Sequence, residues 1–158
     1  MKIIKILSLT LLSAFLLFFY SCERMNEDQK GKIEFSLSID SDQLKSYAIP
    51  DTSRDDIYYS WHILISVMNE NGEYVFEDEI IPLISFGNEF ITGKIEMETG
   101  SYQLTRFMVV GPEGNVIYAA PREGSPKAFL VDRPLPINFK VRPGDVTRVS
   151  PEVLKVGD

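Results

Sequence analysis

The chain has 158 residues with a formal net charge of −7, and it contains one cysteine and one histidine. Nucleic-acid binding needs a basic surface, so the acidic balance excludes nucleic acid as a partner. A single cysteine cannot form an internal disulfide, and one cysteine with one histidine cannot build a zinc site. The composition therefore predicts a fold that is held by its core alone, and we expect no metal and no cofactor, although the acidic residues at 40–42 and 55–56 could provide oxygen ligands for calcium.

The first residues have the features of an export signal. Two lysines, Lys2 and Lys5, precede an apolar run that ends at Ser21 and Cys22. A membrane-spanning helix needs about 20 apolar residues, and this run is shorter. Its length and its flanking residues are typical of a secretory signal. A small residue before a cysteine is the pattern of bacterial lipoproteins, so we predict cleavage after residue 21 and acylation of Cys22, palmitate included. The alternatives are a plain signal peptide or an uncleaved anchor.

The mature chain is more acidic than the precursor. Residues 1–21 contain two lysines and no acidic residue, so 14 basic and 23 acidic groups remain. Because such a body is not attracted to anionic lipid, membrane attachment falls to the lipid on Cys22. We predict an outer-membrane lipoprotein of the cell envelope, facing the periplasm or the cell surface. The polar residues 22–31 are interpreted as its tether.

The domain is expected to cover residues 32–154. Residues 32–39 alternate in polarity, which predicts a strand with one solvated face. On that strand, Ile33, Phe35, Leu37 and Ile39 face the core, whereas Lys32, Glu34, Ser36 and Ser38 face solvent. Residues 40–56 are polar and aperiodic, which favours a loop.

A central strand is expected over residues 57–68, since both faces are apolar from Trp61 onward. The Asn71–Gly72 pair predicts a turn over residues 69–73. Its partner strand, residues 74–81, should end at Pro82. A connector over residues 84–88 then leads to a strand over 90–97, interrupted at Gly93.

The strand over residues 101–110 and its hairpin form the expected centre of the domain. Alternation places Tyr102, Leu104, Met108 and Val110 on one face, and Ser101, Gln103, Thr105 and Phe107 on the other. The turn residues Pro112 and Gly114 predict a hairpin to a strand over 116–120. After a loop over 121–132, proline-bearing strands over 134–141 and 146–154 are expected at sheet edges. Residues 155–158 are a polar tail.

Eight short strands without a helical period predict one antiparallel β-sandwich. The motif Gly100–Ser101–Tyr102–Gln103–Leu104, followed by the hairpin, resembles the centre of prealbumin-like (transthyretin-like, Ig-like) modules. The segments 120–125 and 134–139 are similar to a group of lipoproteins from Bacteroidetes-type bacteria. This resemblance implies a fold and a place on the cell surface, with adhesion or pilus-accessory roles, and it implies no reaction. Tyr102 is expected to fold its hydroxyl onto the backbone as a tyrosine corner.

No enzyme signature is present, because neither a G-x-S-x-G elbow nor an S-x-x-K motif occurs. We therefore predict a non-catalytic binding or assembly module that engages another envelope or extracellular protein by its loops or by an edge strand. The alternative is a glycan-binding lipoprotein of a polysaccharide-uptake system, with Tyr58, Tyr59 and Trp61 as stacking platforms, unless these aromatics belong to the core. A small secreted hydrolase is the remaining alternative.

Overall fold

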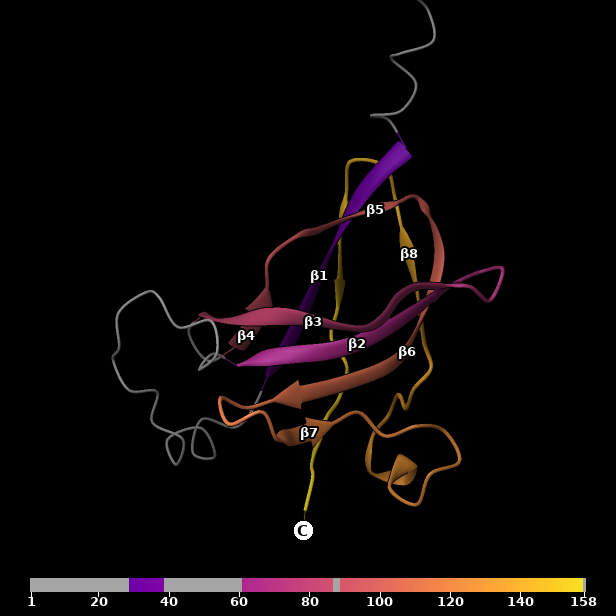
Figure 1. Ribbon diagram of the computed structural model, residues 1–158. Coiled ribbons are helices and arrows are strands. Elements are labelled where there is room, and N and C mark those ends of the chain that lie inside the picture. The colour runs from indigo at the N-terminus through magenta and orange to yellow at the C-terminus, as the bar shows by residue number, and fades with distance from the viewer. Residues whose placement is uncertain (1–28, 39–60, 87–88, 158) are drawn as a thin grey trace, which may run out of the picture.

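Almost all regular structure in the described residues is β-strand (Figure 1). The computed structural model describes residues 29–38, 61–86 and 89–157. The strands are β1 (Lys30–Ser38), β2 (His62–Asn69), β3 (Tyr74–Phe86), β4 (Glu89–Thr92), β5 (Ile95–Glu98), β6 (Gly100–Val110), β7 (Val116–Ala119), β8 (Ile137–Val141), β9 (Val146–Val149) and β10 (Leu154–Lys155), with one short 3-10 helix, η3 (Ala128–Leu130). The prediction of a β-protein is confirmed. In the described part of the chain, no helix has the length and hydropathy needed to cross a membrane.

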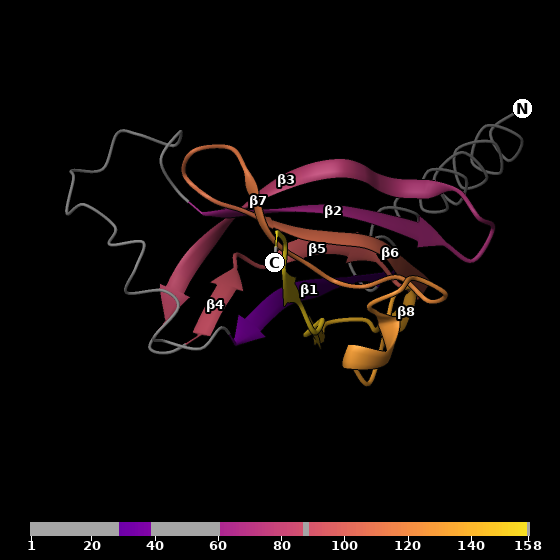
Figure 2. The same ribbon diagram turned by 90° about the horizontal axis from the view of Figure 1, so that it is seen from below.

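The strands form one open, ten-stranded sheet. Its order is β10-β7-β6-β2-β3-β4-β1-β5, with β8 beside β6 and β9 beside β1. All strand pairings among the described residues are antiparallel except the one between β1 and β9. The sheet folds over on itself, because Phe35 of β1 packs on Phe107 of β6 with ring centroids 5.9 Å apart. Figure 2 shows β1 and β4 on the side opposite β2, with the last part of β3 bending across to pair with β4.

The core lies inside the folded sheet and is built from alternate residues of the long strands. Its fully buried members include Ile33 and Phe35 of β1, Ile63 and Ile65 of β2, and Leu104 of β6. Burial of one such side chain stabilises the fold by about 1.5–3 kcal/mol. The inward face predicted for the first strand is therefore confirmed at Ile33, Phe35 and Leu37, whereas Ile39 lies outside the described residues.

The solvated face predicted for β1 is wrong at two residues. Glu34 and Ser36 are only 7% and 6% exposed. The Glu34 carboxylate accepts hydrogen bonds from Nε and Nη2 of Arg148 at 2.9 and 2.7 Å, and Ser36 Oγ lies 2.5 Å from Ser150 Oγ. The physical reason is that β9 pairs with β1 in parallel and brings these partners over its second face. Local alternation carries no information about this distant segment.

The central position of β2 is confirmed, because β2 pairs with β3 on one side and β6 on the other.

The predicted turn after β2 is also confirmed. Asn69 Oδ1 accepts the backbone N–H groups of Asn71 and Glu73 at 3.0 and 2.9 Å, and Gly72 adopts a φ of 82°. This conformation suits glycine, which has no Cβ to clash.

The predicted end of the next strand at Pro82 is wrong, as is the predicted connector after it. β3 continues to Phe86, pairing with β2 as far as Pro82 and with β4 from Leu83 onward. The Leu83 N–H donates to the Trp61 carbonyl at 2.8 Å, on the β2 side. Because successive N–H groups of a strand point to opposite edges, the missing N–H of Pro82 would face the edge away from β2. The proline therefore costs no hydrogen bond to β2.

The alternation predicted along β6 is broken by a bulge. Ser66 pairs with Arg106 and Val67 with Leu104, so Thr105 is an extra residue on β6. Tyr102 and Leu104 are buried as predicted, but beyond the bulge Phe107 and Val109 face the core. The prediction that Phe107 faces outward, with Met108 and Val110 on the Tyr102 face, is wrong because one inserted residue reverses the phase.

The last predicted strand is two strands with different partners. β9 pairs with β1, whereas β10 pairs with β7 at the other end of the sheet, and Pro151 lies between them. The predicted hairpin of β6 and β7 is confirmed, with Gly114 at a φ of 79° in its turn. The predicted break at Gly93 is also confirmed, because it separates β4 from β5.

Candidate functional site

The predicted site residues lie mainly outside the described part of the chain. This holds for Cys22, Tyr58 and Tyr59. Trp61 is described and is only 4% exposed. Its ring packs on Phe90 with centroids 6.1 Å apart, so it belongs to the core. Of the two interpretations of Trp61, the structure therefore favours the core residue over the ligand platform.

Tyr102 forms the predicted corner. Its hydroxyl donates a hydrogen bond to the Glu98 carbonyl at 2.9 Å, and its ring stacks on Phe139 with centroids 5.7 Å apart. Burial raises the pKa of the Tyr102 hydroxyl above its ordinary value of 10.0, and the carboxylates of Glu98 and Glu70 raise it further. The corner thus fixes the start of β6 and the ring of Phe139 beside it.

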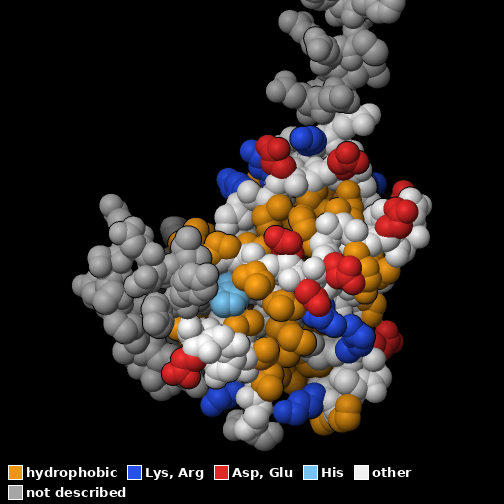
Figure 3. All heavy atoms as spheres, in the orientation of Figure 1, with side chains coloured by type: hydrophobic (Ala, Val, Ile, Leu, Met, Phe, Trp, Pro, Cys, Tyr) orange, Lys and Arg blue, Asp and Glu red, His pale blue; other side chains and the backbone are white. Residues whose placement is uncertain are grey.

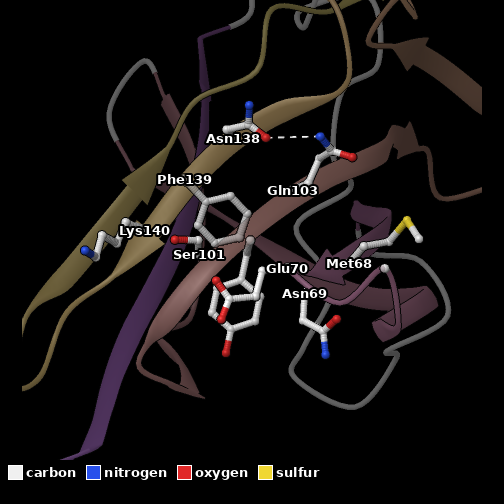
Figure 4. Close-up of a pocket in the computed structure, with 10 residues that line it drawn as sticks. Met68, Asn69, Glu70, Ser101, Gln103, Asn138, Phe139 and Lys140 are labelled. Atoms are coloured by element: carbon white, nitrogen blue, oxygen red, sulfur yellow. Dashed lines mark hydrogen bonds between the residues drawn. The ribbon is translucent and has the colours of Figure 1, made fainter.

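A groove of about 600 Å³ opens beside this aromatic pair (Figure 4). It is formed by β2, the turn after it, β6 and β8. The lining residues are Met68, Asn69, Glu70, Gly72, Ser101, Tyr102, Gln103, Asn138, Phe139 and Lys140. Chain alternation did not reveal this groove, because its three strands are far apart in the sequence and meet only through the sheet register.

Cross-strand pairing determines which polar side chains of the groove lie next to one another. Gln103 lies opposite Met68 on one side and Asn138 on the other, and Ser101 lies opposite Lys140. Gln103 Nε2 donates to Asn138 Oδ1 at 3.1 Å. Figure 4 shows the Phe139 ring between this amide pair and Glu70. Successive residues of a strand point to opposite faces, so the Gln103–Asn138 amide pair lies on the face opposite the Tyr102–Phe139 stack.

A second exposed feature is one edge of β3. Over residues 74–82, β3 pairs with β2 alone, so its other edge has no strand partner among the described residues. Apolar side chains on this segment are exposed: Tyr74 by 51%, Val75 by 43% and Ile80 by 60%. Unpaired edges of this kind are templates for pairing with another chain.

The outer face next to this edge is also apolar. In the sheet register Ile80 lies opposite Leu64, and Leu64 lies opposite Met108. Figure 3 shows hydrophobic side chains gathered over the face formed by β2, β3 and β6. The edge is therefore continuous with an apolar surface.

The same segment is acidic, since Glu77, Asp78 and Glu79 follow one another and are exposed. Asp78 is held in a bulge with a φ of 53°, where its carboxylate pairs with Arg106 and accepts a hydrogen bond from Ser66 Oγ at 3.0 Å. Glu77 and Glu79 form no ion pair with any described residue. Within the described residues these two carboxylates therefore have no basic side chain beside them.

No group of three or more histidine, cysteine, aspartate or glutamate side chains in the described residues is arranged to hold a metal ion. His62 lies on β2, opposite Pro82 and Val110 in the register, and it takes part in interactions there. The groove and the β3 edge are thus candidate binding surfaces in the described part of the chain.

In comparisons with known proteins, no family model and no curated protein matches the chain. A solved structure of a leucine-rich repeat protein from Bacteroides thetaiotaomicron VPI-5482 is similar in fold, with a TM-score of 0.50 and 15% sequence identity. The match covers 80% of this chain and 12% of that much longer chain. At this identity the likeness concerns the fold alone.

Proposed function

We propose that this chain is a lipid-anchored, non-catalytic binding or assembly module of the cell envelope, which presents the open edge of β3 to an extended segment of a partner protein. The single observation that carries the proposal is the unpaired edge along residues 74–82. The anchor is the lipid on Cys22. Packing of β1 against β6 across the core supports a β-sandwich as the scaffold, and the resemblance of residues 100–104 to prealbumin-like modules supports that type.

The partner segment would add to β3 as a new strand. Backbone hydrogen bonds provide affinity in this mode, and alternate side chains provide specificity. The exposed Tyr74, Val75 and Ile80 would pack against apolar residues of the added strand. Such a partner buries apolar surface that is otherwise left in water.

Charge selects among possible partners. Glu77 and Glu79 would face a strand that pairs here, so a segment bearing lysine or arginine is favoured and an acidic segment is repelled. A second copy of the chain would bring the same carboxylates to the same edge. The edge is therefore suited to a basic, partly apolar segment of a different protein rather than to self-association.

A photo-crosslinking residue placed at Val75 of the full chain tests this proposal. The probes are two synthetic strands of equal length, one alternating valine with lysine and the other alternating valine with glutamate. We expect an adduct at Val75 with the basic strand, weakened by salt, and little with the acidic strand. The matched control places the crosslinker at Val116, which is 36% exposed on β7. Equal adducts at both positions, or with both strands, would contradict the proposal.

A further inference from the structure

We propose that the chain pairs with a second copy of itself by inserting the tip of the loop between β7 and β8 into an apolar hollow of that copy. The tip is Phe129 and Leu130 of η3, and the hollow is lined by the end of β1, by η3 and by residues 150–154. Tip and hollow adjoin on one face, so two copies can exchange their tips. This interface is separate from the edge of β3.

The tip exposes a large apolar surface on an ordered loop. Phe129 is 82% exposed and Leu130 is 54% exposed. The Ala128 N–H donates to the Ser125 carbonyl at 3.0 Å. The Leu130 N–H donates to the Lys127 carbonyl at 3.1 Å. Because these bonds hold the loop before binding, insertion of Phe129 loses little backbone entropy. Exposed aromatic side chains of this kind are enriched in the buried centres of protein interfaces.

The hollow has room for one aromatic side chain. Its volume is about 460 Å³, within the range of about 300–1,000 Å³ for pockets that enclose small molecules. The apolar members of its lining are Leu37, Leu130, Val131, Pro151, Val153 and Leu154. A phenylalanine ring placed there exchanges water for apolar surface, which stabilises the contact. Leu130 belongs to both the tip and the lining, so the two features lie side by side.

Local charge favours insertion of the tip into the hollow. Glu89 and Glu152 line the hollow, and its lining contains no basic residue. Lys127 comes directly before the tip, whereas Asp132 and Arg133 follow it, so this segment has one net positive charge. The chain as a whole is acidic, so two copies attract each other only where opposite charges meet. Exchange of tips brings the basic segment of each copy to the acidic hollow of the other.

The position of the tip favours a protein partner over the membrane. β1 begins at Lys30 at one end of the molecule, whereas η3, the short orange helix in Figure 1, lies at the other end. The hollow meets β1 at Ser36 and Leu37, about 20 Å along the strand from Lys30 at about 3.3 Å per residue. A membrane that holds the N-terminus would thus lie opposite the tip. This step alone rests on the proposed lipid anchor.

A two-fold arrangement uses both halves of the interface. In an isologous dimer the same patch of each copy forms the contact, so each copy gives one tip and receives one. Ten residues line the hollow, fewer than the about 20–30 residues on each side of a standard interface. The dimer is therefore expected to dissociate on dilution.

Disulfide trapping between two full-length variants, solubilised in detergent, tests the inference. One variant is Ala128→Cys, beside the tip, and the other is Val153→Cys, in the hollow. Because each variant has one introduced cysteine, a bond between the two cysteines joins different molecules. We expect the mixed pair to form a disulfide dimer in clear excess over either variant alone. The wild type, whose one cysteine is Cys22, gives the background.

Matched variants locate the contact. Phe129→Ala in both partners should lower the yield of the mixed disulfide about tenfold, as expected for the loss of an interface anchor. Tyr74→Ala, at an exposed aromatic residue of β3, is the control and should leave the yield unchanged. Glu89→Lys in both partners should lower the yield as well, whereas Glu113→Lys, an exposed position between β6 and β7, should not. Circular dichroism checks that each variant keeps the fold.

Three results would overturn the inference. The first is the absence of a mixed disulfide above the wild-type background. The second is a yield that Phe129→Ala leaves unchanged. The third concerns the membrane as occupant: if the Cys22→Ala chain bound phosphatidylglycerol vesicles and Phe129→Ala abolished this binding, the tip would belong to a lipid surface.

Discussion

At the scale of single residues, Tyr102 joins the scaffold to the groove. Its hydroxyl bonds to the Glu98 carbonyl and its ring supports Phe139. A glycine before a strand and a tyrosine two residues later predicted the hydrogen bond. The stack on Phe139 could not be predicted in this way, because it depends on the pairing of β8 with β6.

We expect Tyr102→Phe to lower the free energy of unfolding by about 1–2 kcal/mol, because one partly buried hydrogen bond is lost. Tyr102→Ala should lower it by about 3–5 kcal/mol, since the ring also leaves a cavity. Urea unfolding measures both values. The control is Tyr74→Phe, at a tyrosine that is 51% exposed, for which a change within about 0.5 kcal/mol is expected. Near-wild-type stability of Tyr102→Ala would contradict the assigned role.

The difference in unfolding free energy between wild type and Tyr102→Phe should depend on pH in a definite direction. The folded state keeps the Tyr102 proton more tightly than the unfolded state, because burial and the nearby carboxylates raise its pKa above 10.0. The unfolded tyrosine therefore ionises first as the pH rises, and wild type loses stability above about pH 10. Tyr102→Phe lacks this group, so the stability gap between the two proteins should be constant below pH 9 and should narrow above pH 10. If this difference in stability widened above pH 10 instead, folding would lower the pKa of Tyr102 rather than raise it.

At the scale of elements, the start of β1 is fixed by close packing. Gly31 is buried, and a Cβ added to it would lie 2.2 Å from the Arg142 carbonyl oxygen and 2.6 Å from Val141 Cγ1. β1 therefore begins within the polar segment that the sequence assigned to the tether. Composition could not reveal this, since the constraint comes from the turn between β8 and β9.

Gly31→Ala should lower the free energy of unfolding by about 1–3 kcal/mol, the usual cost of overpacking, because the backbone of the β8–β9 turn has to move. Gly93→Ala is the matched control, since no atom lies within 4 Å of an added Cβ there. Chemical denaturation of the two variants makes the comparison. If both variants were equally stable, the close approach of β1 to this turn would be refuted.

At the scale of the whole molecule, attachment to the membrane is predicted from the N-terminal sequence. Cys22→Ala should move the protein from the membrane fraction to the soluble fraction and abolish incorporation of labelled palmitate, because the lipid on Cys22 is the predicted anchor. Met25→Ala, in the expected tether, should leave both properties unchanged. Membrane partitioning and gel mobility like those of wild type in Cys22→Ala would rule out lipidation.

The sequence by itself determined the all-β class, most of the strand segments and the positions of the tight turns after β2 and β6. Alternation identified Ile33, Phe35 and Leu104 as core residues, and turn chemistry located the hairpins after β2 and β6. These features are local, since each depends on residues within one strand or one turn. The motif around Tyr102 is local in the same sense.

Only the tertiary structure decided how the strands combine. The bulge at Thr105 reversed the face of Phe107, and the parallel pairing of β9 buried Glu34 beneath Arg148. The groove of β2, β6 and β8 and the open edge of β3 likewise follow from which strands become neighbours. Sheet pairing joins residues that are far apart in the chain, so its outcome depends on packing of the whole domain and leaves no periodic trace in any one segment.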